Sequence, residues 1–172
     1  MKIQNKYAFR FHLLMALICC ALILADLLTK SLAVVYLKNQ DPIVILPGIL
    51  ELKYLENRGA AFSILTNHQW VFILIAILAI LFLTWVLLRC PIRHHYLGFR
   101  ICLVMILSGA AGNLIDRCTL GYVRDFIYFS LIDFPIFNVA DCYVTIATVL
   151  LIVLILFVYR GDHDFEFLKQ NR

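Results

Sequence analysis

Residues 70–88 read WVFILIAILAILFLTWVLL, a run in which Thr84 is the one polar side chain. An α-helix of about 20 apolar residues is long enough to cross the hydrocarbon core of a bilayer. The run therefore predicts a transmembrane helix. The whole chain agrees with this prediction, because 63% of its 172 residues are hydrophobic and only 15% are charged. A soluble domain of this length would be far more polar.

Three further apolar stretches resemble this run. The cleanest extends from Cys142 to Tyr159, where Thr145 and Thr148 interrupt the apolar residues. The other two carry polar side chains near their ends. We predict a mostly α-helical membrane protein with a small β element, built as a single integral-membrane domain over residues 1–172. Its four transmembrane helices are expected at about residues 11–30, 70–88, 96–116 and 140–159.

Lysines and arginines distinguish the two sides of the membrane. One set gathers near the chain ends and after the second span: Lys2, Lys6, Arg10, Arg89, Arg93, Arg100, Arg160, Lys169 and Arg172. In the loops 36–68 and 117–139, acidic residues balance the basic ones. Because cytoplasmic segments carry the basic excess, we expect both termini in the cytoplasm and both loops outside. The first span also resembles a cleavable signal peptide, but Asp26 and Lys30 interrupt it and three spans follow, so we interpret it as an uncleaved helix.

The two outer loops have different patterns. In the first, the apolar run 43–46, the turn pair at 47–48 and the alternation over 50–54 predict an extracytoplasmic β-hairpin, or cradle, on the membrane surface. Residues 59–65 predict a short interfacial helix between the first two spans. The second loop, 117–139, is rich in aromatic residues, which favour the headgroup level. We expect it to run as a loop along the interface.

The polar residues in and beside the spans cluster at the outer ends of these helices. They are Asp26 and Lys30 in the first span, Asn113, Asp116 and Arg117 at the end of the third, and Asn138 and Asp141 at the start of the fourth. Asp125 lies in the loop between the third and fourth spans. Because charges near hydrocarbon are costly and usually functional, this agreement in depth predicts one polar site near the outer leaflet.

Several of these residues also have a structural interpretation. Asp26 and Lys30 are four residues apart and can form an ion pair along the helix. Asn138 and Asp141 have the spacing of a helix N-cap and its acidic third position. Asp125 has the least obvious structural role. If Asp125 lies beside Asp141, the two carboxylates cannot both ionise easily and share a proton, which is the chemistry of an aspartic protease.

The remaining features limit the chemistry further. Asp116 next to Arg117 is most simply a local salt bridge. Cys118 and Cys142 lie near the outer face, which leaves a disulfide open. The sequence has no C-x-x-C pair and no histidine cluster at metal spacing, so we expect no metal and no cofactor. The polar tail after Tyr159 is expected to fray.

Two other classes of protein remain open at this point. A small transporter could relay protons through Asp26, Lys30 and Asp141, but the inner halves of the second and fourth spans lack the polar residues of a conduction path. In a scaffold subunit every charge would be a packing pair, which leaves Asp125 and the aromatic loop without a role.

Five stretches, in this order along the chain, resemble the lipoprotein signal peptidases, or type II signal peptidases. They are DLLTK (26–30), NRGAAF (57–62), GAAGNLIDR (109–117), GYVRDF (121–126) and FPIFNVAD (134–141). Any one of them is a weak motif. Their order on four predicted spans, from the first span into the fourth, makes the resemblance specific.

The resemblance implies an activity, a site and a location. Members of this family are intramembrane aspartic endopeptidases of the bacterial inner membrane, which remove the signal peptide from diacylglyceryl-modified prolipoproteins by cutting before the lipid-modified cysteine. By motif, Asp125 and Asp141 match the catalytic pair. The positions that match substrate-binding or supporting residues are Asn57, Gly59, Asn113, Arg117, Asn138, Asp26 and Lys30. The implied partners are the prolipoprotein and membrane lipids. We expect a multi-pass monomer without a nucleic-acid partner, with its active site near the periplasmic leaflet.

Overall fold

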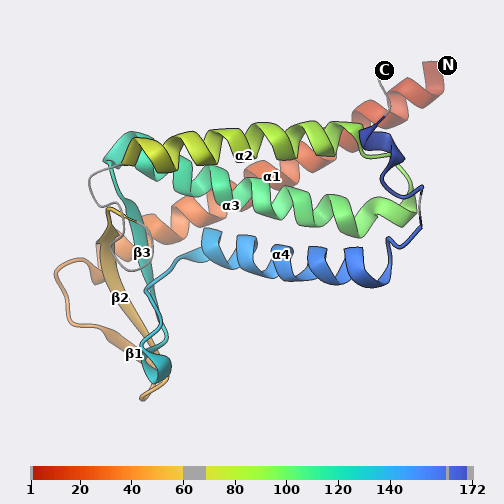
Figure 1. The fold of residues 1–172 in the computed structure, drawn as a ribbon. Helices are drawn as coiled ribbons and strands as arrows, with labels where there is room; N and C mark the ends of the chain where they lie inside the picture. Colours follow the sequence, from red (N-terminus) through yellow and green to blue (C-terminus); the bar gives the residue numbers. More distant parts are fainter. Residues whose placement is uncertain (1, 60–68, 162, 170–172) are drawn as a thin grey trace.

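The computed structural model describes residues 2–59, 69–161 and 163–169. Four long helices lie side by side, with a small sheet at one end of the bundle and both chain termini at the other (Figure 1). The helices are α1 (Lys2–Leu37), α2 (Gln69–Arg89), α3 (Leu97–Leu120) and α4 (Val139–Phe157). All four are long and apolar enough to cross a membrane. The four predicted spans are therefore confirmed as helices, although α1 and α3 extend further than the sequence pattern indicated.

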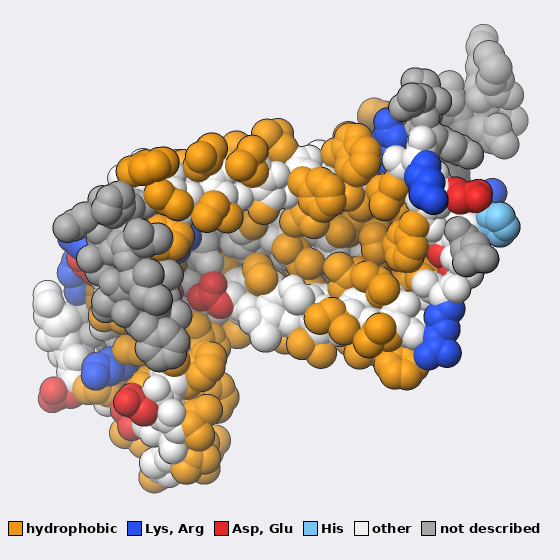
Figure 2. Space-filling view, viewed as in Figure 1, with side chains coloured by type: hydrophobic (Ala, Val, Ile, Leu, Met, Phe, Trp, Pro, Cys, Tyr) orange, Lys and Arg blue, Asp and Glu red, His pale blue; other side chains and the backbone are white. Residues whose placement is uncertain are grey.

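The surface of the bundle matches a membrane environment. Hydrophobic side chains cover its middle, and charged side chains gather at its two ends (Figure 2). In the apolar 18-residue stretch of α3, 50% of the residues are buried. The corresponding share is 11% in α1 and 6% in α2. The third helix therefore lies at the centre and packs against the other three.

Two glycines allow the close approach of α3 to its neighbours. A Cβ atom on Gly109 would lie 2.4 Å from the carbonyl oxygen of Ala140 in α4. A Cβ atom on Gly112 would lie 2.4 Å from Oδ2 of Asp26 in α1. Small residues in membrane helices let backbones approach in this way. This close packing brings the polar ends of α1, α3 and α4 together.

The sheet has three antiparallel strands in the order β1-β2-β3. They are β1 (Ile43–Leu46), β2 (Leu50–Asn57) and β3 (Val123–Tyr128). The predicted hairpin is confirmed, with Gly48 at a φ of +69° in its turn. The prediction of a loop over 117–139 is wrong for residues 123–128, which form β3 and include Asp125. The residues of β3, VRDFIY, are mostly β-branched or aromatic and favour a strand; we had interpreted the aromatic ones as interface anchors.

Apolar contacts attach the sheet to the first helix. Ala33 and Leu37 of α1 form a buried cluster with Phe126 of β3, and Leu52 and Ile127 pack against it. Phe126 and its strand are thus held between α1 and the hairpin. This contact places β3 beside the polar ends of the helices.

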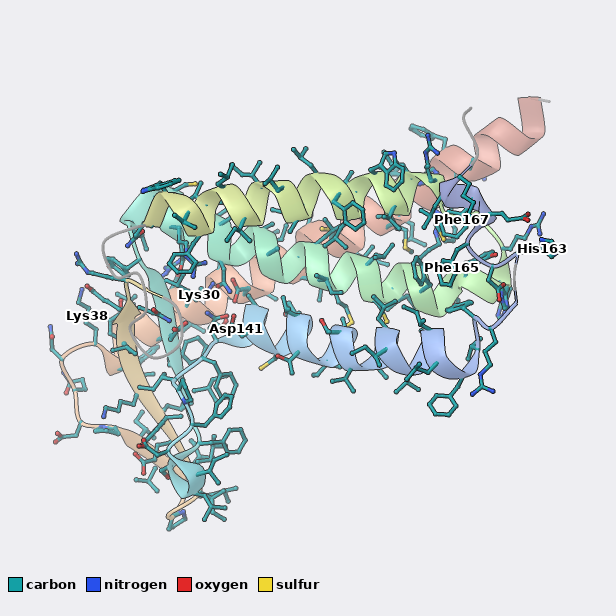
Figure 3. All side chains as sticks on the ribbon, in the orientation of Figure 1. Lys30, Lys38, Asp141, His163, Phe165 and Phe167 are labelled. Atoms are coloured by element: carbon teal, nitrogen blue, oxygen red, sulfur yellow. The ribbon has the colours of Figure 1, made fainter. Side chains whose placement is uncertain are left out.

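At the opposite end, the C-terminal tail folds back onto the bundle. Phe165 and Phe167 pack around Tyr96, Phe99 and Tyr159 with ring centroids 5.6–6.4 Å apart. Figure 3 labels both phenylalanines at the end of the bundle that lies away from the sheet. The prediction of a frayed tail is wrong for residues 163–169, because these aromatic side chains are as apolar as the core that they cover. The described residues also form the short helices η2 (His94–Tyr96), η3 (Ser130–Ile132) and η4 (Glu166–Leu168).

Two other predictions concern the sheet end of the bundle. The interfacial helix predicted over 59–65 lies outside the described residues except for Gly59. Cys118 and Cys142 are both free thiols.

Candidate active site

Amide side chains from two other segments hold Asp125. Asp125 pairs in register with Leu55 of β2 and is 2% exposed. The Asn57 amide donates a hydrogen bond of 2.8 Å to Asp125 Oδ2, and the Asn138 amide donates one of 2.6 Å to Oδ1. Asn57 can reach this carboxylate because residues two apart on a strand share a face of the sheet. Both carboxylate oxygens therefore accept hydrogen bonds from neutral donors.

Asp141 lies in the first turn of α4 and is also held by amides. The side chain of Asn138 accepts a hydrogen bond of 3.1 Å from the Asp141 backbone N–H. Asp141 Oδ2 accepts one of 3.1 Å from the Asn138 backbone N–H, which completes a capping box. The Asn113 amide of α3 donates a third bond, of 2.8 Å, to Asp141 Oδ1. The predicted cap is therefore confirmed, and it fixes the carboxylate at the helix start.

Asn138 connects the two carboxylates. Its amide nitrogen donates to Asp125 and also, at 3.1 Å, to Asn113 Oδ1, while Asn113 donates to Asp141. The segment before α4 delivers Asn138 to this position, because Phe137 exchanges backbone hydrogen bonds of 2.8 and 3.0 Å with β3. An unbroken chain of amides thus runs from one carboxylate to the other.

The surroundings of Asp125 favour its protonated form. Burial, with a smaller contribution from the neighbouring Asp141, raises the pKa of the Asp125 carboxyl to about 6, against the hydrogen bonds from Asn57 and Asn138. Among the residues that the structure describes, no lysine or arginine forms an ion pair with Asp125 or Asp141. Two carboxylates that share a site cannot both ionise easily. This pair is therefore suited to hold one proton and exchange it.

A second pair of carboxylates, Asp26 and Asp116, lies close by and contacts cations. Both residues are 0% exposed. Lys30 Nζ lies 2.7 Å from Asp26 Oδ2 and 3.7 Å from Asp116 Oδ2. Arg124 Nη2 lies 2.6 Å from Asp116 Oδ1. The predicted pair of Asp26 and Lys30 is thus confirmed. The predicted bridge from Asp116 to Arg117 is wrong, because the Asp116 oxygens face Lys30 and Arg124.

Lys30 connects the second carboxylate pair to the first. Its Nζ donates a hydrogen bond of 2.8 Å to Asn113 Oδ1. The same Asn113 donates from its nitrogen to Asp141. Figure 3 shows Lys30 and Asp141 at the sheet end of the bundle. Lys30 therefore orients the Asn113 amide that donates to the Asp141 carboxylate.

A cavity of about 900 Å³ lies beside Asp125 and Asp141. Its polar lining includes both aspartates together with Asn57, Gly59 and Arg117. Its apolar lining comes largely from residues 129–137 and from the first turns of α4. The volume falls in the range of about 300–1,000 Å³ that is usual for ligand sites. The pair of carboxylates is thus open to a ligand of substantial size.

Arg117 contacts an aromatic ring and not its neighbour Asp116, with which the sequence suggested a salt bridge. Its guanidinium lies over the Phe72 ring of α2, 5.4 Å from the ring centroid. Because Arg117 also lines the cavity, it places a positive charge at the wall of the space that contains the two aspartates.

Known proteins resemble this chain in sequence and in fold. The family model described as Signal peptidase (SPase) II matches residues 18–157. The chain belongs to the signal peptidase II family. A lipoprotein signal peptidase from Streptococcus pyogenes serotype M5 (strain Manfredo) is 41% identical over 132 residues, which cover 77% of this chain and 86% of that relative. One from serotype M3 (strain SSI-1) is 40% identical over the same length.

Two solved structures share the fold of this signal peptidase II chain. Both are described as bacterial membrane enzymes whose structures were determined by the in meso method, at 2.3 and 1.9 Å resolution. The first has a TM-score of 0.74 and 30% identity, and the match covers 86% of this chain and 92% of that one. The second has a TM-score of 0.72 and 31% identity, with 83% and 92% covered.

The signal peptidase II fold brings the motif residues into one region. The hydrogen-bonded network contains Asp26, Lys30, Asn57, Asn113, Asp125, Asn138 and Asp141. Gly59 donates its backbone N–H to Asn57 Oδ1 at 3.0 Å. Sequence reasoning missed the contact between Arg124 and Asp116. A strand prediction over VRDFIY could have found it, because Arg124 then points away from the Asp125 side of β3.

Proposed function

We propose that this chain is an intramembrane aspartic endopeptidase that removes the signal peptide from diacylglyceryl-modified prolipoproteins. In this proposal it cuts on the N-terminal side of the lipid-modified cysteine, and residues 1–172 act as one membrane peptidase domain. The observation that carries the proposal is the pair Asp125 and Asp141, which amides hold together at the wall of a cavity of about 900 Å³. Membership of the signal peptidase II family supports the same reaction.

The reaction needs one proton shared by the two aspartates. The ionised carboxylate removes a proton from a water molecule as its oxygen attacks the carbonyl carbon of the scissile bond. The protonated carboxyl donates a hydrogen bond to the carbonyl oxygen and stabilises the charge that develops there. When the tetrahedral intermediate collapses, the leaving nitrogen takes a proton from the pair. The signal peptide leaves as the carboxyl product, and the pair again holds one proton. The proton belongs to the pair, so neither aspartate is assigned one role alone.

The neighbouring polar residues have supporting roles in this proposal. Asn57, Asn113 and Asn138 orient the two carboxylates without adding charge. Lys30, neutralised by Asp26, fixes the orientation of the Asn113 amide.

Two further residues face the cavity from its edges. Arg117 is a positive group for the polar backbone or lipid part of the substrate, and the Gly59 backbone N–H holds the Asn57 side chain that donates to Asp125.

In this proposal the reaction takes place at the outer leaflet of the bacterial inner membrane, and the distribution of basic residues supports this side. Both termini lie at the end of the bundle away from the sheet (Figure 1), where Arg89, Arg93 and Arg160 also lie. Because cytoplasmic ends carry the basic excess, the termini face the cytoplasm and the sheet faces outward. The cavity near the sheet then lies where a lipid-anchored precursor emerges. The enzyme works as a monomer among membrane lipids, without a nucleic-acid partner.

A cleavage assay with matched precursors tests the proposal. Purified enzyme is mixed with a diacylglyceryl-modified precursor and, separately, with the same precursor without lipid, and shortening is followed by mass spectrometry. We expect cleavage of the lipidated precursor before its cysteine. Asp125→Asn and Asp141→Asn should each lower the rate by at least about a hundredfold. Asp41→Asn, which changes an exposed carboxylate in the loop after α1, is the control and should keep the parental rate.

Two outcomes would contradict the proposal. Parental cleavage by either dyad variant would remove the assignment of Asp125 and Asp141. Ion flux through reconstituted vesicles, without shortening of any precursor, would instead identify a transporter.

A further inference from the structure

Asp116 binds both the backbone and the side chain of Arg124, the residue immediately before Asp125. Its Oδ2 accepts hydrogen bonds from the Arg124 backbone N–H at 3.0 Å and from Nε at 3.1 Å. Its Oδ1 accepts one from Nη2 at 2.6 Å. A guanidinium that donates two bonds to one carboxylate makes a strong contact of defined geometry. The third bond fixes the main chain itself.

This contact lies on the opposite face of β3 from the candidate dyad. Successive side chains of a strand point to opposite faces of the sheet. Arg124 reaches Asp116 on α3 and, at 3.4 Å, Ser31 on α1, whereas Asp125 reaches Asn57 and Asn138. Because adjacent residues share a peptide plane, a displacement of Arg124 moves Asp125 as well.

The charges around this contact are balanced. Four buried or half-buried groups form one network of zero net charge: Asp26, Asp116, Lys30 and Arg124. The network reaches Asp125 through the backbone of Arg124, and it reaches Asp141 through the bond from Lys30 to Asn113. The same four charged groups therefore contact residues that hold Asp125 and residues that hold Asp141.

We propose that Asp116 and Arg124 are positioning residues for the peptidase reaction, which clamp β3 to α3 and so set where the Asp125 carboxylate stands relative to Asp141. The inference rests on the proposed function and deepens it. Neither residue belongs to the described lining of the cavity, so both act through Asp125 and do not touch the substrate.

A merely structural role makes a different prediction. If the clamp only stabilised the fold, its loss would lower the amount of folded enzyme. Each folded molecule would then keep the parental kcat, KM and pH profile. A positioning role instead lowers kcat per folded molecule and changes the proton affinity of Asp125. The two roles are separated when kcat is normalised to folded protein, measured by circular dichroism and by elution as a single species in detergent.

The variants are chosen so that charge balance is kept. Asp116→Asn alone leaves two buried cations against one anion and is expected to fold poorly. The double variant Asp116→Asn with Arg124→Gln removes one charge of each sign. Arg124→Lys keeps the charge and the backbone bond but loses the guanidinium fork. Glu56→Gln is the matched control, because Glu56 is the cross-strand partner of Arg124 and its ion pairs are with Lys38 and Arg58.

We expect the double variant to fold and to cleave lipidated precursor with a kcat lower by about 10- to 100-fold, since displacement by about 1 Å can cost that much. Its KM should change less than about twofold, because the cavity lining is unchanged. The kcat of Arg124→Lys should lie between that of the double variant and that of the parental enzyme. The kcat of Glu56→Gln should match that of the parent.

The pH profile gives a second readout. Hydrogen bonds from Asn57 and Asn138 lower the pKa of Asp125, so if the strand moves and they lengthen, the pKa rises. The other charged groups that face Asp125 are Asp141, Lys30 and Arg117, and none of them is changed in these variants. The limb of the rate profile near pH 6 should therefore move to higher pH in the double variant.

The outcomes are distinguishable from a failure of the proposed function. If the parental enzyme does not cleave the lipidated precursor, the proposed function is wrong. If the parental enzyme cleaves it and the folded double variant keeps the parental kcat and pH profile, the clamp is only structural and the inference is overturned.

Discussion

The two pairs of carboxylates at the sheet end of the bundle have different partners. Asp26 and Asp116 each contact a lysine or arginine at 2.6–3.7 Å. Asp125 and Asp141 accept hydrogen bonds from asparagine amides at 2.6–2.8 Å. Three of these four carboxylates are buried and Asp141 is half-buried, so burial alone does not separate the two pairs.

The difference in partners gives the two pairs different chemistry. A cation in contact stabilises the carboxylate as a permanent anion, and the two together are neutral. An amide also donates to a carboxylate, but it brings no charge and leaves protonation possible at moderate pH. The first pair is thus suited to hold helices together, and the second to exchange a proton.

The largest expected effect is an opposite change in stability for two aspartate-to-asparagine variants. Asp26→Asn leaves Lys30 buried beside a neutral group and should lower the free energy of unfolding by about 3–5 kcal/mol. Asp125→Asn should be at least as stable as the parent at pH 7. Burial raises the pKa of Asp125 from 3.8 to about 6. Ionisation of this carboxyl at pH 7 therefore lowers the free energy of unfolding of the parent by up to about 3 kcal/mol.

The sign follows from proton linkage. A carboxyl whose pKa is raised by folding stabilises the folded state below its unfolded pKa and loses this contribution as pH rises through about 6. Melting of both variants and the parent in detergent micelles, followed by circular dichroism, gives the comparison. Equal destabilisation of the two variants at pH 7 would mean that amides and cations support these carboxylates in the same way.

A smaller effect is expected where α3 approaches the cation-paired aspartate. In Gly112→Ala the new Cβ meets Asp26 Oδ2 at 2.4 Å, so the carboxylate that neutralises Lys30 has to move. We expect a loss of about 1–3 kcal/mol of stability from overpacking, and a lower kcat because Lys30 orients Asn113. Gly98→Ala is the control, since its Cβ meets the end of the Leu154 side chain at 3.3 Å. Equal activity in both variants would separate the Asp26 pair from catalysis.

The pH dependence of cleavage addresses the amide-bound pair directly. With the pKa of Asp125 raised to about 6 by burial, the shared proton is lost above this pH. We expect kcat to fall by up to about tenfold per pH unit as pH rises through the apparent pKa. The measurement is kcat for cleavage of the lipidated precursor in micelles at several pH values. A rate that instead rises over the same range would show that the doubly ionised pair is the active form.

The sequence predicted the membrane part of this molecule well, for a clear physical reason. A run such as residues 70–88 has few alternatives, because hydrocarbon requires every backbone group to be bonded within the helix. The capping box of Asn138 and Asp141 and the ion pair of Asp26 and Lys30 are contacts over three and four residues, so spacing alone predicted them.

Contacts between distant segments were harder to predict. The bond from Arg124 to Asp116 depends on which face of β3 points to α3, and we had not predicted β3. The aromatic residues that build this strand also suit a membrane interface, so composition did not distinguish the two. Likewise, Phe165 and Phe167 lie in a polar tail but pack against a buried cluster. The sequence did not indicate this contact, because two aromatic rings are too few to form a periodic pattern.

The smallest effect concerns Asn138, which serves both as a helix cap and as the link between the two carboxylates of the amide-bound pair. Asn138→Ala removes both roles and should lower the free energy of unfolding by about 0.5–2 kcal/mol. Asn138→Ser restores the cap, because a serine hydroxyl accepts from the helix N–H groups, but it cannot donate to both Asp125 and Asn113 as the amide does. We therefore expect Asn138→Ser to melt like the parent and to cleave as slowly as Asn138→Ala. If serine restored cleavage together with stability, the amide chain between the aspartates would be unnecessary, and capping would be the whole role of Asn138.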